Sequence, residues 1–311
     1  MHCETIRFSP YKRLKLHTYL NEWTTRPCVW PRRQAVIVLP GGGLQLHTVS
    51  EGEPVAMAFA AAGYQAFVLD YRVGKECVYP NGLEDIGLAL RYIRSRAGEW
   101  NIDPDKITLC GFSSGGGLAM DMCAKWNDPE VQQLCGLEGL GDADTTLKPY
   151  AVILGYSVSI VELSGSNDMQ RLFRGDRTQE DMAYLLDVDR LAGPHLVPAF
   201  IWHTFYDQLV PVEHSLRVAG ALARYDIPFE LHIFTNGGHG GGLFTQATAL
   251  GDESRISAHN AEWFPLCLRW MNDLLGAPME PMAQAPIPGE SPRAHVGHDI
   301  PQLTNYVSLT T

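Results

Sequence analysis

One short segment constrains the fold of this chain more than any other: residues 107–119, ITLCGFSSGGGLA. An apolar run of β-forming residues meets a glycine-rich turn, and a helix-compatible run follows at 118–126. A strand, a tight turn and a helix in this order occur in α/β enzymes, where the turn either binds a phosphate or presents a serine nucleophile. The rest of the chain must decide between these two uses.

The order of the other elements predicts an α/β fold, with a mostly parallel central sheet and helices on both faces. Strand-like and helical runs alternate, and parallel neighbours need such crossover helices. The predicted strands are 5–8, 14–20, 35–39, 65–70, 106–110, 150–154, 198–204 and 228–234, and the predicted helices are 55–62, 83–96, 178–187, 213–225 and 258–275. The motif Ser50-x-x-Glu53, followed by Pro54, is typical of a helix start.

The chain is expected to form one domain followed by a tail. Residues 1–276 carry the alternating pattern, whereas residues 277–311 are proline-rich and aperiodic and indicate a tail outside the core. Residues 155–197 interrupt the domain with a polar, loop-rich insertion at the end of a strand, where substrate-shaping loops are common. The oligomeric state stays open, and one hypothesis is that the tail packs on a neighbouring subunit of a homo-oligomer.

Charge and cysteine content argue against several kinds of partner. The net charge is −11 and no basic block offsets it, so nucleic acid and anionic membranes are not expected partners. The N-terminus lacks the apolar core of a signal peptide, and no apolar stretch is long enough to span a bilayer. The 7 cysteines form no C-x-x-C pair, which indicates reduced thiols and a cytoplasmic protein.

The tail contains one combination of metal-ligand residue types. His295, His298 and Asp299 could ligate a metal if they lay on a helix. Pro292 and Gly297 disfavour a helix there, so the segment is interpreted as a polar strap. We therefore expect no metal, and the chemistry considered below requires no organic cofactor.

The glycine-rich segment identifies Ser113 as the candidate nucleophile. A serine in a strained strand-to-helix turn favours glycine two positions before and two positions after it, because both positions crowd a neighbouring chain segment. Ser113 has Gly111 and Gly115 at these positions, whereas Ser114 would have the bulky Phe112 at the first. The alternative, an anion-binding loop, requires Lys-Ser or Lys-Thr after the last glycine or the spacing G-x-G-x-x-G, and neither is present.

An acid and then a histidine should follow such a serine, each just beyond the carboxyl end of a strand. Asp207 follows the predicted strand 198–204, and His239 follows the predicted strand 228–234 in the run GGHGGG. The plainer alternatives are a helix cap for Asp207 and an exposed loop residue for His239. The other acids and histidines considered are less well placed relative to the strands: Asp187, Asp189, His232 and His259.

An oxyanion hole should be formed by backbone amides of the residue after the nucleophile and of a loop after an earlier strand. The run LPGGGL follows the predicted strand 35–39, and its glycines let backbone N–H groups approach an oxyanion unobstructed. We assign the oxyanion hole to the amides of Gly42, Gly43 and Ser114. A plain tight turn is the alternative, but it would rarely need three successive glycines.

With these residues in place, the chain resembles the α/β-hydrolase superfamily, and more closely the bacterial acetyl esterase/lipase group that includes carbohydrate acetylesterases and xylan esterases. The resemblance covers roughly residues 30–275 and rests on LPGGGL, FVLDYRV, NIDPDKITLCGFSSGGGLA, WHTFYDQLVP and GGHGGG. Many relatives with a hormone-sensitive-lipase-like loop carry His before the glycines. Here Pro40 stands in that position, as in the acetylesterase branch.

The resemblance implies a serine esterase for short acyl groups, acetyl above all, with a small ester or an acetylated xylo-oligosaccharide as substrate. The expected mechanism is two-step acyl transfer, in which Ser113 attacks, His239 accepts its proton and Asp207 orients His239. The alternatives are another acyl hydrolase on this fold, such as a peptidase or formamidase, and a ligand-binding protein that has lost catalysis. The intact serine, acid and histidine argue against the last alternative.

Overall fold

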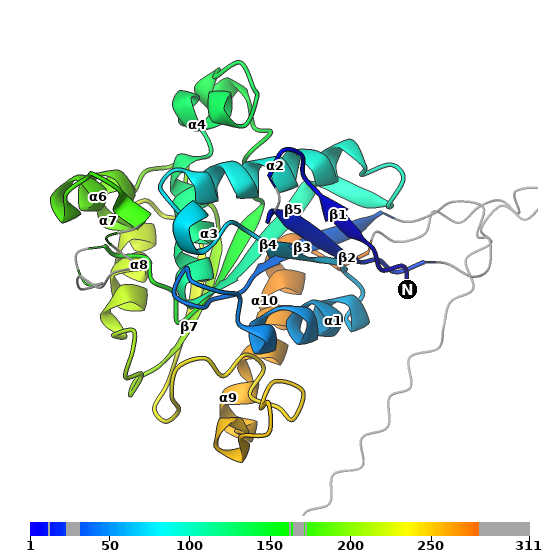
Figure 1. The fold of residues 1–311 in the computed structure, drawn as a ribbon. Coiled ribbons are helices and arrows are strands. Elements are labelled where there is room, and N and C mark those ends of the chain that lie inside the picture. The colour runs from blue at the N-terminus through cyan, green and yellow to red at the C-terminus, as the bar shows by residue number, and fades with distance from the viewer. Residues whose placement is uncertain (12, 23–31, 162, 164–170, 172, 280–311) are drawn as a thin grey trace, which may run out of the picture.

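The computed structural model describes the chain apart from residues 12, 23–31, 162, 164–170, 172 and 280–311. In the described residues, eight strands form one sheet in the order β1-β2-β4-β3-β5-β6-β7-β8 (Figure 1). Strand β2 runs antiparallel to β1 and β4, and the remaining neighbours run parallel. The predicted α/β fold with a mostly parallel sheet is confirmed.

The strands alternate with helices along the chain, as the sequence pattern predicts. The strands are β1 Thr5–Arg7, β2 Lys15–Tyr19, β3 Arg33–Leu39, β4 Gln65–Asp70, β5 Ile102–Phe112, β6 Ala151–Gly155, β7 Ala199–Thr204 and β8 Phe229–Phe234. The longer helices are α1 Glu53–Ala61, α2 Asn81–Ser95, α3 Ser113–Lys125, α6 Gln179–Leu186, α8 Glu213–Ala223 and α10 Trp263–Leu275. The shorter helices are α4 Pro129–Leu134, α7 Val188–Leu191 and α9 Ala258–Ala261.

Helices cover both faces of the sheet, and each face has its own apolar core. Figure 1 shows α1 and α10 on one side of the sheet and α2 on the other. Successive side chains of a strand point to opposite faces, so Val36 and Val38 of β3 join one core while Ile37 and Leu39 join the other. Burial on both faces is typical of parallel sheets and explains the continuous apolar run in β3.

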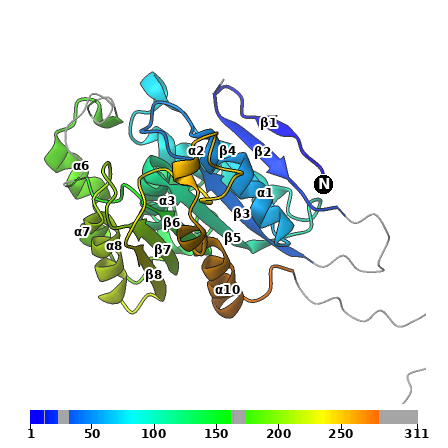
Figure 2. The same cartoon turned by 90° about the horizontal axis from the view of Figure 1, so that it is seen from below.

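The carboxyl ends of the parallel strands lie along one edge of the sheet, and the loops that follow them carry the candidate site residues. Strands β1 and β2 lie at one end of the sheet, and α6, α7 and α8 gather near the other end (Figure 2). Helices α6 and α7 belong to the insertion predicted at 155–197, and α6 agrees with the helix predicted at 178–187. In the part of the chain that the structure describes, no helix combines the length and apolar character needed to cross a bilayer.

The predicted glycine-rich turn between β5 and α3 is wrong, because α3 begins directly at Ser113. The three glycines at 115–117 form the start of this helix. A Cβ on Gly116 would lie 2.6 Å from the Ser157 Cβ, and one on Gly117 would lie 2.3 Å from the Val158 carbonyl oxygen. These glycines therefore serve close packing of α3 against the chain beyond β6.

The helix start predicted at residues 50–54 is confirmed, because α1 begins at Glu53 with Pro54 in its first turn. Ser50 does not cap this helix, however, since the N-cap residue is Gly52 and no side chain caps it. Ser50 and the adjacent Glu51 are instead buried. At the other end of the domain, residues 277–279 lie beside β3. The backbone N–H of Gln34 donates to the Pro278 carbonyl at 2.8 Å. The rest of the predicted tail lies outside the described residues.

Candidate active site

Ser113 is the first residue of α3 and directly follows the last residue of β5, Phe112. Its φ of +50° lies in the left-handed region, which costs a residue with a Cβ roughly 1–2 kcal/mol. A Cβ on Gly111 would lie 2.5 Å from the Gly115 carbonyl oxygen, and a Cβ on Gly115 would lie 2.3 Å from the Leu39 carbonyl oxygen. The two flanking glycines thus permit the sharp turn that presents the Ser113 side chain beyond the end of β5.

Ser113, His239 and Asp207 form a continuous hydrogen-bonded chain. The Ser113 Oγ lies 2.9 Å from the His239 Nε2, and the His239 Nδ1 lies 2.7 Å from the Asp207 Oδ2. The first pair is separated by 126 residues in sequence and the second by 32. The structure brings the three residues together because β5, β7 and β8 are parallel and end at the same edge of the sheet.

The Asp207 carboxylate is held by four hydrogen-bonding groups. Its Oδ1 accepts the backbone amides of Leu209 and Val210, at 2.8 and 2.9 Å. Burial raises the pKa of this carboxyl, but hydrogen bonds from His203 and His239 outweigh burial and hold the pKa well below its usual range. An ionised Asp207 accepts a hydrogen bond from the His239 Nδ1–H, and this leaves the His239 Nε2 as an acceptor for the Ser113 hydroxyl.

His203 is a supporting residue that the sequence reasoning missed. This buried ring has its Nε2 3.0 Å from the Val210 carbonyl and 3.6 Å from the Asp207 Oδ2, and its Nδ1 2.7 Å from the Ser215 Oγ. Because a carbonyl only accepts, the Nε2 carries the proton and also directs it toward Asp207. The signal for this role would have been a polar residue inside the apolar strand β7.

The glycine loop after β3 lies against the same cavity as the Ser113 side chain. Gly42 and Gly43 have positive φ values of 129° and 61°. Their backbone amides donate to no hydrogen bond within the described residues. The Ser114 amide lies in the first turn of α3, where no intrahelical acceptor is available. These three residues, Ser113 and His239 line one cavity of about 500 Å³.

A buried acid, Glu51, connects the loops around this cavity. Its Oε2 accepts the Gly41 amide at 2.7 Å, and its Oε1 accepts the Tyr156 hydroxyl at 2.6 Å. The Tyr156 hydroxyl in turn accepts the Gly242 amide at 3.2 Å. The Tyr156 ring also packs against the His239 ring, with 4.7 Å between the ring centroids. One carboxyl group therefore ties together the loops that follow β3, β6 and β8.

Glu51 acts on the glycine loop through the Gly41 amide. Because that amide already has an acceptor, only the next two amides along the loop remain available to an oxyanion. Burial raises the pKa of the Glu51 carboxyl, and its hydrogen bonds to Tyr156 and Gly41 oppose this shift. The sequence reasoning missed Glu51 because its segment was interpreted as a helix start, and no local pattern separates it from a surface acid.

His214 also lines the cavity, although the sequence reasoning did not single it out. Its Nδ1 accepts the Ile160 amide at 3.1 Å. Burial lowers the pKa of this ring to about 4, so it is neutral near pH 7. With Nδ1 occupied as an acceptor, the ring proton resides on Nε2.

The rival candidates of the sequence reasoning have other contacts and do not line this cavity. Asp187 accepts the Val161 amide, Asp189 pairs with Arg217, His232 bonds to Glu230, and the His259 ring packs on Phe234. Among the described residues, no group of three or more His, Cys, Asp or Glu side chains could hold a metal ion. The tail residues His295, His298 and Asp299 lie outside the described part.

Comparison with known families and proteins places this chain among esterases. The BD-FAE family profile matches residues 31–222, which is more than half of the chain. The endo-1,4-beta-xylanase B of Butyrivibrio fibrisolvens is 34% identical over 218 residues, which make up 67% of this chain and 32% of the xylanase. The chain therefore spans about a third of the length of that relative.

Solved structures agree with this placement. The carboxylesterase Cest-2923 from Lactobacillus plantarum WCFS1 superposes with a TM-score of 0.77 at 26% identity, covering 89% of this chain and 98% of that one. An acetyl ester-xyloside bifunctional hydrolase from Caldicellulosiruptor lactoaceticus gives a TM-score of 0.68 at 30% identity, covering 86% and 90%. The resemblance stated from the sequence is confirmed. The chain belongs to the BD-FAE family, within the α/β-hydrolase group of carboxylic ester hydrolases.

Proposed function

We propose that this protein is a serine esterase that removes short acyl groups, acetyl above all, from carbohydrates such as acetylated xylo-oligosaccharides. The observation that carries the proposal is the hydrogen-bonded chain from Ser113 through His239 to Asp207, beside the unoccupied amides of the glycine loop. The relatives whose names include a xylanase and an acetyl ester-xyloside hydrolase support the choice of a carbohydrate ester.

In the first half of the proposed reaction, the Ser113 Oγ attacks the ester carbonyl carbon while the His239 Nε2 takes the hydroxyl proton. Asp207 stabilises the resulting imidazolium. The amides of Gly42, Gly43 and Ser114 bind the oxyanion, where loss of one donor typically costs about 100- to 1,000-fold in rate. The bond to the alcohol oxygen then breaks, and the His239 Nε2–H donates its proton to that oxygen.

In the second half, a water molecule attacks the acyl-enzyme carbonyl. His239 takes a proton from this water and returns it to the Ser113 Oγ as the acid leaves. The same residues therefore serve both halves, and the balance of the reaction is one ester and one water in, one alcohol and one acid out.

We also propose that the protein works in the cytoplasm on a diffusible small ester and not on nucleic acid or a membrane surface. Its net charge of −11 supports this choice, because anionic polymers and surfaces are repelled. The homo-oligomer hypothesis is tested by analytical ultracentrifugation of the full chain and of a truncation after Ala277. An unchanged oligomeric state on truncation would contradict a role for the tail.

The proposed function is tested by initial rates on p-nitrophenyl acetate, butyrate and octanoate, and then on acetylated xylo-oligosaccharides. We expect acetate to be fastest and Ser113→Ala to lower kcat by roughly 10⁴- to 10⁶-fold. The exposed Ser95 provides a matched control, and Ser95→Ala should retain full activity. A wild-type protein that is inert on esters but cleaves formamides or peptides would replace esterase activity by the alternative acyl-hydrolase function.

A further inference from the structure

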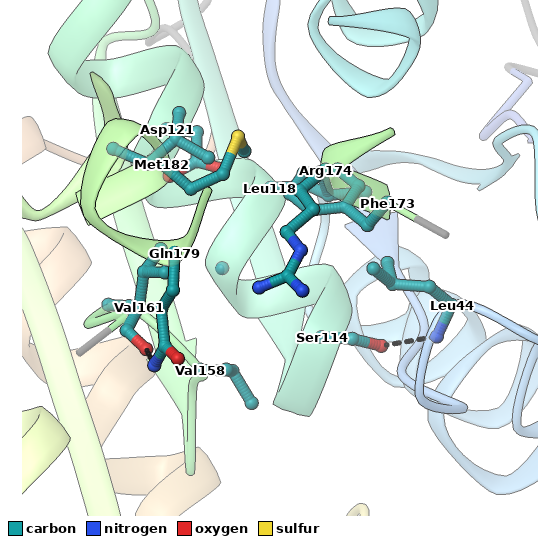
Figure 3. Close-up of a pocket in the computed structure, with 13 residues that line it drawn as sticks. Leu44, Ser114, Leu118, Asp121, Val158, Val161, Phe173, Arg174, Gln179 and Met182 are labelled. Carbon is teal, nitrogen blue, oxygen red and sulfur yellow. Dashed lines mark hydrogen bonds between the residues drawn. The ribbon is translucent and has the colours of Figure 1, made fainter. Parts of the chain in front are cut away.

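A second pocket opens beside the catalytic cavity, and we call it the side pocket (Figure 3). It shares Leu44, Ser114 and Val158 with the catalytic cavity, but neither Ser113 nor His239 lines it. Its other walls include Leu118, Asp121, Phe173, Arg174, Gln179 and Met182. Its volume is about 90 Å³, roughly three times the share of one water in the liquid.

The position of the side pocket assigns it to one half of the ester. In the proposed mechanism, the leaving alcohol oxygen must lie within reach of the His239 Nε2, which protonates it. The alcohol half therefore extends on the side of the cavity formed by His239 and the adjacent Gly240, both of which line it. The acyl half extends away from His239, toward the walls that both spaces share. The side pocket thus continues the path of the acyl group.

Helix α3 leads from the nucleophile to an acid in the side pocket. Ser114, Leu118 and Asp121 lie at helical spacing on one face of α3 and line the pocket in this order. Figure 3 shows Asp121, with Met182, at the end away from Leu44 and Ser114. Asp121 is only 7% exposed and makes no hydrogen bond or ion pair with the described residues. Burial raises the pKa of this carboxyl well above its usual value, which favours the neutral form that can donate a hydrogen bond.

The side pocket also contains an arginine that pairs with no described residue. Figure 3 shows the Arg174 guanidinium directed into the pocket from the wall formed by Phe173 and Arg174. Other polar side chains of the pocket do have partners. The Ser159 hydroxyl donates to Ser157 at 2.9 Å, and the Gln179 amide donates to the Val161 carbonyl at 3.3 Å. Asp121 and Arg174 are thus the two ionisable side chains of the pocket that pair with no other described residue.

We propose that the side pocket binds the acyl half of the ester and selects acyl groups that end in a carboxylate, so that half-esters of short dicarboxylic acids are substrates. This inference rests on the proposed function and uses the same hydrolytic steps, with a dicarboxylate as the released acid. Leu118, Val158 and Phe173 contact the methylene groups of the acyl chain. The Arg174 guanidinium pairs with the terminal carboxylate, for which its planar donor geometry is suited. An acetyl group ends before this pocket and makes no use of it.

The test compares two substrates that differ only in charge: monoethyl glutarate and its amide isostere, ethyl 4-carbamoylbutanoate. Acid release is followed in a pH-stat at about pH 7.5, and ethyl acetate serves as the reference ester. We expect the wild type to have a kcat/KM about tenfold or more higher for the half-ester than for the amide. Arg174→Gln should bring this ratio down to about one, because it removes the charge and keeps much of the side-chain length.

Three further variants make the result specific. Arg177 is exposed and stacks over the Tyr79 ring at 5.2 Å, outside the side pocket, so Arg177→Gln should leave the ratio unchanged. Asp121→Asn keeps a donor and should retain most of the half-ester activity, whereas Asp121→Leu should raise KM for both long substrates.

The outcomes separate the two proposals. No hydrolysis of ethyl acetate would contradict the proposed function itself. Hydrolysis of ethyl acetate with equal kcat/KM for half-ester and amide would overturn the side-pocket inference alone. An unchanged ratio in Arg174→Gln would also overturn it.

Discussion

The catalytic cavity and the side pocket lie next to each other but differ in how their ionisable side chains are hydrogen-bonded. In the cavity, Asp207 accepts two backbone amides and His239, and Glu51 accepts an amide and a hydroxyl. In the side pocket, Asp121 and Arg174 have no partner among the described residues. Catalytic groups gain from being fixed before the substrate arrives, whereas recognition groups keep their hydrogen-bonding capacity for the ligand. The difference supports the two proposals above, in which the cavity performs the chemistry and the side pocket selects the substrate.

The largest loss of activity should follow from a substitution of Asp207, which lies in the cavity whose charged groups are paired. We expect Asp207→Asn to lower kcat on p-nitrophenyl acetate by about 10⁴-fold. A neutral amide cannot stabilise the imidazolium, and its NH₂ group favours the wrong His239 tautomer. The control is Asp226→Asn, at an exposed turn residue, which should keep full activity. A loss of less than tenfold in Asp207→Asn would contradict the role proposed for this acid.

A smaller loss should follow from Glu51→Gln, which perturbs the loops without touching Ser113 or His239. The Gln side chain has one acceptor oxygen where Glu51 uses two, so either the Gly41 amide or the Tyr156 hydroxyl loses its acceptor. A misplaced oxyanion loop costs on the order of 100-fold, and we expect it in kcat with little change in KM. Glu53→Gln, two positions away and exposed, is the matched control. An equal rise in KM would indicate a substrate-binding role for Glu51.

The smallest effect is a change in thermal stability, and it tests whether the unpaired Asp121 carboxyl is neutral in the folded protein. Burial raises the pKa of this carboxyl above its unfolded value of about 3.9, so its stabilising contribution is complete below that pH and is lost as pH rises through the folded pKa. Asn does not titrate, so the variant Asp121→Asn does not lose stability in this way as the pH rises. The Tm advantage of the variant over wild type should therefore grow between about pH 4 and pH 8, reaching a few degrees.

Thermal unfolding of both proteins across this pH range measures the effect at Asp121. The exposed Asp273 supplies the control, and Asp273→Asn should show no such trend. A Tm difference that does not vary with pH would show that Asp121 does not enter the folded state as a neutral acid.

The residues of the hydrogen-bonded chain were predictable because their placement follows from topology. A serine elbow requires glycine at two fixed positions, and parallel strands bring their following loops to one edge of the sheet. Ser113, Asp207 and His239 could therefore be singled out from motif and order alone. The start of α3 could not, because the glycines after Ser113 are typical of both a turn and a closely packed helix.

Glu51 and Asp121 show why the rest of the site escaped prediction. The contact of Glu51 with Tyr156 joins residues 105 positions apart, and it depends on how two loops meet above the sheet. Asp121 lies on α3, and Met182 and Leu186 of the insertion line the same pocket that it borders. Both acids acquire their properties from tertiary packing, which leaves no local signature in the sequence.

The carboxyl of Glu51 also bears on how molecules reach and leave the catalytic cavity. The loops after β3, β6 and β8 share this single buried anchor, so none of them can swing open alone without breaking a buried hydrogen bond. Beyond Tyr156, the described residues of the insertion that line the cavity are Val158 and Leu163, and neither bonds to Glu51 or Tyr156. We therefore expect substrate entry and product exit to occur past these two residues, where the chain can move without breaking the bonds to Glu51.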